Sequence, residues 1–312
     1  MKIIVTGGTG FVGREVVRQL LERGDEVTVF TRQSSSVAEP QESRLSYVQW
    51  DPTVARLPAG ILDGAQAIIH LAGEVAVGRR LTSAVQHQVR ESRLASTSLL
   101  AAALEEATTG PRVFVSCSAV GYYGSRPPAQ LLTERDGPGR DFLAQLCVDW
   151  EDRSKAAPPT TRVVNPRLGI VFGPGGGALE AMALPFRLFI GGPLGDGRQI
   201  ISWVHLHDVA RALIFCVDNE KLSGPVNVTA PHPVDNRTLS EIVGKVLHRP
   251  SALPTPAFAL RALFGEGAAP LLEGQRVEPR KLLDAGFEFR FNDAKQAVEQ
   301  SLSHPDSRTG SA

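Results

Sequence analysis

The chain has 312 residues, of which 42% are hydrophobic and 21% charged, a composition typical of a globular protein with one large core and a smaller attached lobe. Lys and Arg number 33, and Asp and Glu also number 33, so no net charge attracts nucleic acid or an anionic membrane and we expect neither partner. The three cysteines, Cys117, Cys147 and Cys216, are widely spaced in apolar segments, which argues against a zinc or disulfide framework and predicts buried reduced thiols in a cytoplasmic protein.

The chain opens with the pattern of a βαβ unit. The run KIIVT at residues 2–6 is mainly apolar and predicts a buried parallel strand. Apolar residues then recur at helical spacing between residues 12 and 21, and Gly24 provides a stop for that helix. EVTVFT at residues 26–31 predicts a second strand, so two strands joined by one helix begin the chain.

A glycine-rich turn joins the first strand to the first helix. Gly7, Gly10 and Gly13 form the pattern G-x-x-G-x-x-G, in which the first glycine permits the turn. The second lets backbone N–H groups approach a pyrophosphate, and the third lets the helix pack on the strand. Glycines that only make a turn are the alternative, but their placement between this strand and this helix favours a dinucleotide site. We expect six residues to contact the dinucleotide: Gly7, Thr9, Gly10, Phe11, Val12 and Gly13.

The end of the second strand predicts which dinucleotide binds. An acidic side chain at this point would hydrogen-bond the ribose 2′-hydroxyl of NAD, whereas a cation accommodates the additional phosphate of NADP. The chain has Thr31 and Arg32 here, followed by three serines, and it has no carboxylate at this point. A guanidinium beside hydroxyl donors favours NADP(H) as the cofactor, with an exposed surface arginine as the alternative.

Further strands and one long helix follow. LSYVQW and AIIHLAG predict strands whose carboxyl ends carry Asp51 and the turn of Leu71, Ala72 and Gly73. We expect these residues to line the cofactor site, because an open α/β sheet binds its ligand at the carboxyl ends of its strands. The segment from about residue 81 to residue 107 predicts one long helix, and VFVSCS after it predicts a fifth strand.

The motifs together resemble a known family. TGGTGFVG near the amino end, LAG after the fourth strand and SCSAVGYYG after the fifth resemble the extended and atypical short-chain dehydrogenase/reductases. Two later blocks, PFRLFIGGPLGDGRQIISWVHLHD and GQRVEPRKLLDAGFEFRF, are similar to those of one subgroup, the epimerase-like proteins with a characteristic C-terminal domain. The likeness is to the NAD-dependent epimerase/dehydratase-like family and covers most of residues 1–300.

The resemblance implies a fold and a division of the chain. The fold is α/β, a doubly wound (Rossmann) parallel sheet that carries NADP(H), with a smaller C-terminal substrate lobe. We expect a Rossmann domain over residues 1–240, with an insertion near 172–203 that contributes to the substrate lobe, and a small C-terminal domain over residues 241–302. Residues 303–312 lack apolar periodicity, so we expect a disordered tail.

The catalytic pair of the resembled enzymes is missing. Most of them use a Tyr and a Lys four residues apart, because positions i and i+4 share one helix face and the ammonium lowers the pKa of the phenol. The corresponding helix here reads DFLAQLCVDWE, and it offers Phe142 or Leu143 for the tyrosine and Leu146 or Cys147 for the lysine. We expect its apolar stripe to pack on the sheet or on another subunit, and the second arrangement would make a homodimer.

Hydroxyl groups after the fifth strand are the remaining candidates for chemistry. The resemblance implies that Ser118 is the hydroxyl that binds a substrate carbonyl, and Tyr122 or Tyr123 just beyond it could replace the missing proton donor. The alternative is that YYG is a structural turn that packs against the substrate lobe.

The SWVHLHD segment could suggest a metal site, because alternation places His205 and His207 on one face, close to Asp208. We favour a structural junction between a strand and a helix, in which Asp208 caps the helix, and we expect no metal.

Two functions are consistent with these features. In the first, the protein is an NADP(H)-dependent oxidoreductase or epimerase that acts on an unknown small carbonyl or hydroxyl compound. In the second, it binds NADP(H) without turnover and acts as a redox sensor or regulatory protein. The missing Tyr and Lys favour the second function, whereas Ser118, the paired tyrosines and a full-length substrate lobe favour the first, which we expect.

Overall fold

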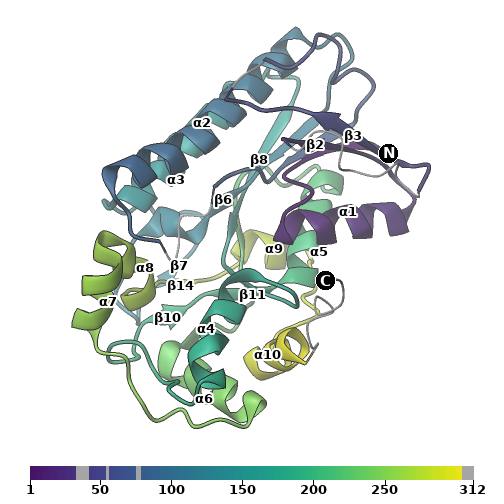
Figure 1. The fold of residues 1–312 in the computed structure, drawn as a ribbon. Helices are drawn as coiled ribbons and strands as arrows, with labels where there is room; N and C mark the ends of the chain where they lie inside the picture. Colours follow the sequence, from purple (N-terminus) through teal and green to yellow (C-terminus); the bar gives the residue numbers. More distant parts are fainter. Residues whose placement is uncertain (33–41, 54–55, 75–78, 304–312) are drawn as a thin grey trace, which may run out of the picture.

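The computed structural model describes residues 1–32, 42–53, 56–74 and 79–303, and it is built on one parallel sheet (Figure 1). The strands of this sheet are β1 (Lys2–Thr6), β2 (Glu26–Thr31), β3 (Leu45–Gln49), β4 (Ala67–His70), β5 (Val113–Ser116), β6 (Ser118–Ala119), β8 (Arg162–Leu168) and β12 (Gly224–Val228). Their order is β12-β8-β5-β4-β1-β2-β3, with β6 paired to β8. The chain therefore reverses its direction of winding between β1 and β4, which confirms the predicted doubly wound fold.

Helices cover both faces of the sheet. Helices α1 (Phe11–Arg23) and α5 (Leu206–Asp218) pack together on one face, and α2 (Ser83–Glu106) and α3 (Phe142–Ser154) pack together on the other (Figure 1). Successive side chains of β1 point to opposite faces of the sheet. Ile3 and Val5 join the core under α1 and α5, whereas Ile4 joins the core under α2. A strand buried on both faces explains why its central residues 3–5, IIV, are all apolar.

Local signals set the ends of these helices. Gly24 ends α1 in the left-handed region, with a φ of 94°, as its place in the sequence predicts. The side chain of Thr82 accepts a hydrogen bond from the backbone of Val85 at the start of α2. Asp141 caps α3 in the same way, through the backbone N–H of Ala144. The long helix predicted over about residues 81–107 is confirmed as Ser83–Glu106.

A proline lies where β8 has a gap in pairing on its β5 side, opposite Val226 of β12 on the other side. Pro166 lies in β8, beyond the residues that pair with β5 and before the residue that pairs with Ser118 of β6. Proline has no N–H to give to a neighbouring strand, so a gap in pairing tolerates it. The side chain of Asn165 donates instead to the carbonyl of Ser116, at 3.1 Å.

The lobe below the sheet has its own core. Helices α4 (Gly177–Arg187), α6 (Asn236–Leu247) and α10 (Ala294–Leu302) pack around β9 (Ile170–Phe172) and β11 (Trp203–His205). The rings of Phe172 and Trp203 stack in this core, with centroids 5.6 Å apart. The remaining elements are η1 (Val120–Tyr123), β7 (Leu131–Leu132), β10 (Ile200–Ile201), β13 (Val234–Asp235), α7 (Ala257–Phe264), η2 (Gly265–Ala268), α8 (Ala269–Leu272), β14 (Arg276–Val277) and α9 (Arg280–Asp284).

The C-terminal segment contributes to both cores. Leu282 of α9 and Phe287 join the main core beside β12, whereas α10 belongs to the lobe. The domain boundary expected at residue 240 falls inside α6. Of the expected disordered tail, Ser303 caps α10, and the rest lies outside the described residues. No helix in the described ranges is long and apolar enough to cross a bilayer.

The prediction that Asp208 caps α5 is wrong. His205 is the N-cap of that helix and accepts from the backbone N–H of His207. The buried Asp208 carboxylate instead accepts the backbone N–H groups of Arg290 and Phe291, at 3.0 and 2.8 Å, because the C-terminal segment passes beside the first turn of α5. The SWVHLHD segment thus anchors the C-terminal segment, and the described residues contain no group of three or more His, Cys, Asp or Glu side chains suited to a metal.

Candidate functional site

The glycine turn, residues 7–13, is as tight as its sequence predicts. Gly7 has a φ of 70°, in the left-handed region, and a Cβ on it would lie 2.9 Å from the backbone nitrogen of Ala72. A Cβ on Gly13 would lie 2.1 Å from the carbonyl oxygen of Gly7, to which the N–H of Gly10 donates at 3.0 Å. The backbone of the turn therefore touches both α1 and the segment that follows β4.

The amino end of α1 carries no side-chain cap. Gly10 is the N-cap residue, and the structure shows neither a side-chain cap hydrogen bond there nor an acidic residue in the first turn of this helix. Thr9 precedes the helix, and Phe11 and Val12 begin it. Free N–H groups at the positive end of a helix form an anion site that suits a pyrophosphate.

Phe11 also joins the glycine turn to the lobe. Its ring fills the space over Gly176 and Gly177, where Cβ atoms would lie 3.1 and 2.6 Å from ring carbons. These two glycines lead from β9 into α4. The sequence GPGGG therefore has a packing reason that the sequence analysis did not identify.

Arg32 and Asp51 lie at the carboxyl ends of the neighbouring strands β2 and β3. The exposed Arg32 guanidinium pairs with Glu74, with Nη1 and Oε1 3.2 Å apart. Asp51 accepts from the hydroxyl and the backbone N–H of Thr53, and these bonds, together with the charge of Arg32, lower the pKa of Asp51. Thr31 is buried at the end of β2, and the three serines after Arg32 lie outside the described residues.

The segment Leu71, Ala72 and Gly73 continues from β4 beside the glycine turn. The backbone N–H of Leu71 donates to the carbonyl of Thr6 at 3.1 Å, which extends the pairing of β4 with β1. Just before it, Nδ1 of the buried His70 lies 2.6 Å from the hydroxyl of Thr6. Burial lowers the pKa of His70 to about 3, so the ring is neutral and serves to join the two strands.

Helix α3 packs within the chain. Its buried side chains include Leu146, Cys147 and Trp150, and the helix lies against α2, η1 and β6. The indole N–H of Trp150 donates to the hydroxyl of Thr97 on α2, at 2.9 Å. Burial raises the pKa of Cys147 to about 11, so the thiol stays protonated and is a poor nucleophile. All three cysteines are free and buried, as predicted.

The far end of the same helix brings a carboxylate into the interior. Glu151 accepts from the hydroxyl of Ser118 at 2.8 Å and forms a two-point ion pair with Arg167, with both N–O distances at 2.8 Å. The Arg167 side chain is only 2% exposed. Burial acts against its charge, but the Glu151 carboxylate raises the pKa of Arg167, so the pair is ionised.

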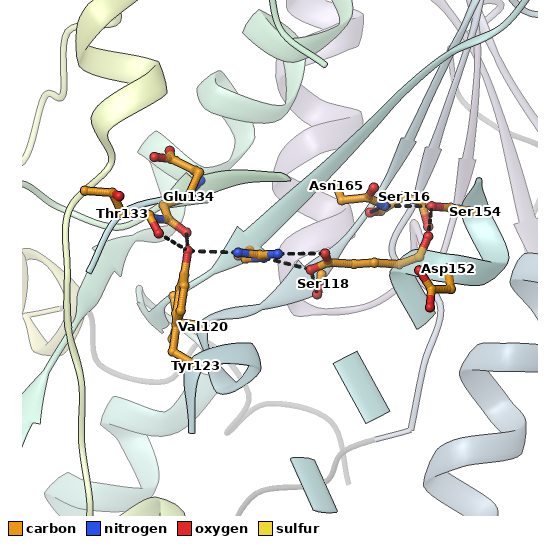
Figure 2. A network of polar contacts seen from close by, with 12 residues as sticks. Ser116, Ser118, Val120, Tyr123, Thr133, Glu134, Asp152, Ser154 and Asn165 are labelled. Atoms are coloured by element: carbon orange, nitrogen blue, oxygen red, sulfur yellow. Dashed lines mark hydrogen bonds and ion pairs between the residues drawn. The ribbon is translucent and has the colours of Figure 1, made fainter. Parts of the chain in front are cut away.

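Arg167 and Glu151 together connect Ser118 to Tyr123, and Figure 2 shows these residues in one polar network that continues past Glu151 to Ser154 and Asn165. Nη1 of Arg167 donates to the Tyr123 hydroxyl at 2.9 Å. That hydroxyl also lies 2.7 Å from Oδ1 of Asn227 and 3.0 Å from the carbonyl oxygen of Thr133. Burial raises the pKa of Tyr123 to about 12, which makes this phenol a poor acid near neutral pH.

Tyr122 is the more accessible of the two tyrosines. Its ring lies under the Arg167 guanidinium, with the centroid 3.4 Å from Cζ. Within the described residues its hydroxyl makes no hydrogen bond, and the side chain lines a cavity of about 540 Å³ with Glu151 and Lys155. We refer below to Ser118, Tyr122, Tyr123, Glu151 and Arg167 as the Arg167 cluster.

Sequence reasoning selected the three hydroxyl residues of the Arg167 cluster but not the ion pair that joins them. A signal for Glu151 exists, because it stands four residues after Cys147 and so continues the buried stripe of α3. A carboxylate on a buried stripe requires a cation as partner. The identity of that cation follows only from the pairing of β6 with β8, which sets Ser118 opposite Arg167.

Comparison with known proteins identifies the family. A model described as "NAD dependent epimerase/dehydratase family" matches residues 3–229. This chain belongs to that family. A second model, described as "Domain of unknown function (DUF1731)", matches residues 255–301 of this epimerase-family chain, in agreement with the C-terminal domain expected from the resemblance.

Named relatives cover nearly the whole chain. The mouse epimerase family protein SDR39U1 is 36% identical over 304 residues, which are 96% of this chain and 99% of the mouse protein. The SDR39U1 homolog of Arabidopsis thaliana, named as chloroplastic, is 36% identical over 96% of this chain and 86% of its own length. Human SDR39U1, crystallised with NADPH, is 33% identical, with a TM-score of 0.88 over 98% of this chain and 100% of the human chain. A UDP-N-acetylglucosamine 4-epimerase of Methanobrevibacter ruminantium, 20% identical with a TM-score of 0.78 over 97% of each chain, shares the fold.

Proposed function

We propose that this epimerase-family protein binds NADP(H) across the carboxyl edge of its sheet and acts as an oxidoreductase or epimerase on a small carbonyl or hydroxyl compound. The observation that carries the proposal is the glycine turn. It is tightly closed, and its residue Gly10 has no side chain to cap the amino end of α1. The human relative crystallised with NADPH supports the choice of dinucleotide. The buried reduced thiols support a cytoplasmic location.

The residues at the turn fit a dinucleotide phosphate. The N–H groups of Phe11, Val12 and Gly13 would hold the pyrophosphate, and Arg32 would hold the 2′-phosphate after leaving Glu74. Leu71, Ala72 and Gly73 would line the opposite half of the site, because β4 lies on the other side of β1 from β2. NADP(H), when bound, supplies the hydride chemistry.

Tyr122 is our candidate for the proton donor. Its hydroxyl makes no hydrogen bond within the described chain, whereas those of Ser118 and Tyr123 are held in the Arg167 cluster. We assign Ser118 and Tyr123 to positioning, since each fixes one end of the ion pair whose guanidinium stacks on the Tyr122 ring.

A non-catalytic sensor is the second candidate. The observation that favours it is α3, whose buried positions carry a protonated thiol and apolar side chains instead of a Tyr and a Lys. In this case NADP(H) would bind with the same contacts at the glycine turn, and substitutions in the Arg167 cluster would change only stability.

Titration with NADPH and NADH tests the proposal. We expect NADPH to bind more tightly, and Arg32→Glu to weaken it by ~2 kcal/mol or more with little effect on NADH, because a carboxylate would face the 2′-phosphate. Arg44→Glu is the matched control, because Arg44 is an exposed arginine paired with Glu42. Failure of the wild-type protein to bind either dinucleotide at millimolar concentration would refute the proposal, and equal weakening of both by Arg32→Glu would refute the cofactor assignment.

Turnover distinguishes the enzyme from the sensor. With any substrate that oxidises NADPH, Tyr122→Phe should lower kcat by ~10²-fold and leave NADPH affinity unchanged. Ser118→Ala and Tyr123→Phe should be folded controls with smaller losses. Full activity in all three variants would place the proton donor outside this loop.

A further inference from the structure

A half-buried arginine, Arg93, lies beside the proposed cofactor site and is not part of the Arg167 cluster. Arg93 projects from α2 to the segment that follows β4, where its Cζ would be 3.2 Å from a Cβ on Gly73. A side chain at Gly73 would therefore require the Arg93 side chain to shift. On the other side, the guanidinium lies over the ring of Trp150 on α3, with Cζ 5.0 Å from the centroid.

This position is close to the glycine turn. A Cβ on Gly7 would touch the backbone nitrogen of Ala72, the residue directly before Gly73, so only one residue separates the turn from the contact with Arg93. Arg93 also lies near Cys147 of α3. The guanidinium thus stands between the dinucleotide site and the stretch of α3 that lacks the Tyr and Lys.

The guanidinium has hydrogen-bonding capacity to spare. It donates from Nη1 to the carbonyl of Val89 at 3.1 Å, and among the described residues it makes no other hydrogen bond and no ion pair. Burial lowers the pKa of Arg93, with Glu74 and Cys147 acting in the opposite direction, which shows that the cation has lost part of its hydration. By contrast, Arg167 and Arg32 are paired with carboxylates.

The missing partner of this cation has the chemistry of a carboxylate. A planar guanidinium with adjacent free N–H groups matches the two oxygens of a carboxylate. A phosphate dianion would call for a second cation, but the nearby His70 is neutral and Arg90, one turn away on α2, is paired with Asp149 at 2.5 Å. The Arg93 guanidinium, which has one positive charge and one planar set of N–H donors, therefore favours a monoanion.

We propose that Arg93 binds a carboxylate of the substrate, so that the proposed oxidoreductase or epimerase acts on small oxo acids or hydroxy acids. The inference rests on the proposed function, because it places the substrate next to bound NADP(H). It assigns Arg93 to substrate recognition and Gly73 to making room for it.

Paired probes test the inference. The wild-type protein is saturated with NADP⁺, so that an oxidised probe cannot react, and is titrated calorimetrically with pyruvate, 2-oxobutanoate and 2-oxoglutarate. Each acid is compared with the amide in which a carboxamide replaces the carboxylate next to the carbonyl. The amide has nearly the same shape but lacks that charge. We expect at least one acid to bind ~10-fold or more tightly than its amide, since charged hydrogen bonds are lost in the amide. No preference for any acid over its amide at millimolar concentration would overturn the inference.

Substitutions test whether Arg93 causes the preference for an acid over its amide. Arg93→Gln should abolish the preference for the acid, and Arg93→Lys should keep part of it, because the charge remains without the fork. Arg90→Gln on the same helix should leave it unchanged. A preference that survives in folded Arg93→Gln would show that Arg93 only stacks on Trp150 and would overturn the inference.

The same titrations separate the two proposals. If the wild-type protein binds NADPH but prefers no acid, the inference about Arg93 fails alone. If it binds no dinucleotide, the proposed function fails and the inference fails with it. If Arg93→Gln does not fold, Arg93→Lys and the comparison of acid and amide on the wild-type protein still decide the question.

Discussion

The glycine turn and the Arg167 cluster occupy two halves of one sheet edge but use polar groups in opposite ways. At the glycine turn, the polar groups are backbone N–H groups at the uncapped end of α1. In the Arg167 cluster, Glu151, Arg167 and the hydroxyls of Ser118 and Tyr123 satisfy one another in the interior. The first region is built to receive a ligand, and most of the second is built to hold itself together. Substitutions in the first should therefore change binding, and those in the second, apart from Tyr122, should mainly change stability.

The largest expected effect on binding comes from Gly13→Ala. Its Cβ would meet the Gly7 carbonyl oxygen at 2.1 Å, so the turn must open. We expect NADPH affinity to fall by ~100-fold or more, about 2.7 kcal/mol, with a lower Tm. Gly137→Ala is the control, because a Cβ there meets nothing within 4 Å. Unchanged NADPH affinity in Gly13→Ala would contradict the assignment of the turn.

The converse result is expected for Glu151→Leu. This change leaves the Arg167 cation buried without its carboxylate, which should reduce the free energy of unfolding by ~3–5 kcal/mol, while NADPH affinity stays within ~3-fold. Urea unfolding measures the first quantity. The double variant with Arg167→Met should recover much of the loss, because it removes the stranded charge.

An exposed ion pair supplies the control for this prediction. Glu180→Leu removes the partner of Arg187, whose side chain is 45% exposed, and should cost less than ~1 kcal/mol. Similar losses in Glu151→Leu and Glu180→Leu would show that burial does not increase the contribution of the Glu151–Arg167 pair to the free energy of unfolding.

His70, which lies on β4 between β1 and β5, predicts a dependence of stability on pH. Its pKa is about 3 in the folded chain and ~6.5 when unfolded, so the unfolded chain takes up the proton first as the pH falls. Stability from this residue is complete above ~pH 6.5 and declines by ~1.4 kcal/mol per pH unit below it, about 2 kcal/mol by pH 5. The unfolding free energy of His70→Gln should therefore fall less steeply with acid. The exposed His87→Gln should follow the wild-type curve, and parallel curves for His70→Gln would refute the assignment.

Apart from the control variants, the smallest effect is expected for Cys147→Ser. A buried hydroxyl in place of the thiol should cost about 1 kcal/mol of stability, and NADPH binding and turnover should be unchanged. Native protein should react with a maleimide far more slowly than unfolded protein, because the thiol is protonated and buried. Loss of turnover in a folded Cys147→Ser protein would restore a chemical role to α3.

Patterns of residues close together in the sequence predicted the elements that local geometry determines. The βαβ unit, the Gly24 stop and the long α2 follow from residues close in sequence, and all three are confirmed. Contacts made at long range left no such signal. Asp208 binds backbone N–H groups 82 and 83 residues later, and the expected cap was wrong for that reason. Likewise, the space that Gly73 leaves for Arg93 depends on how α2 packs beside β4.

The contact of Phe11 with Gly176 and Gly177 joins the dinucleotide turn directly to the lobe. The first residue of α1 rests on the loop that leads into α4, so the phosphate-binding turn and the lobe share one contact. A ligand that shifts this loop and thereby changes dinucleotide affinity by some factor must itself gain or lose affinity by the same factor when the dinucleotide binds. A pair of titrations on one protein, each ligand with and without the other, can compare the two factors.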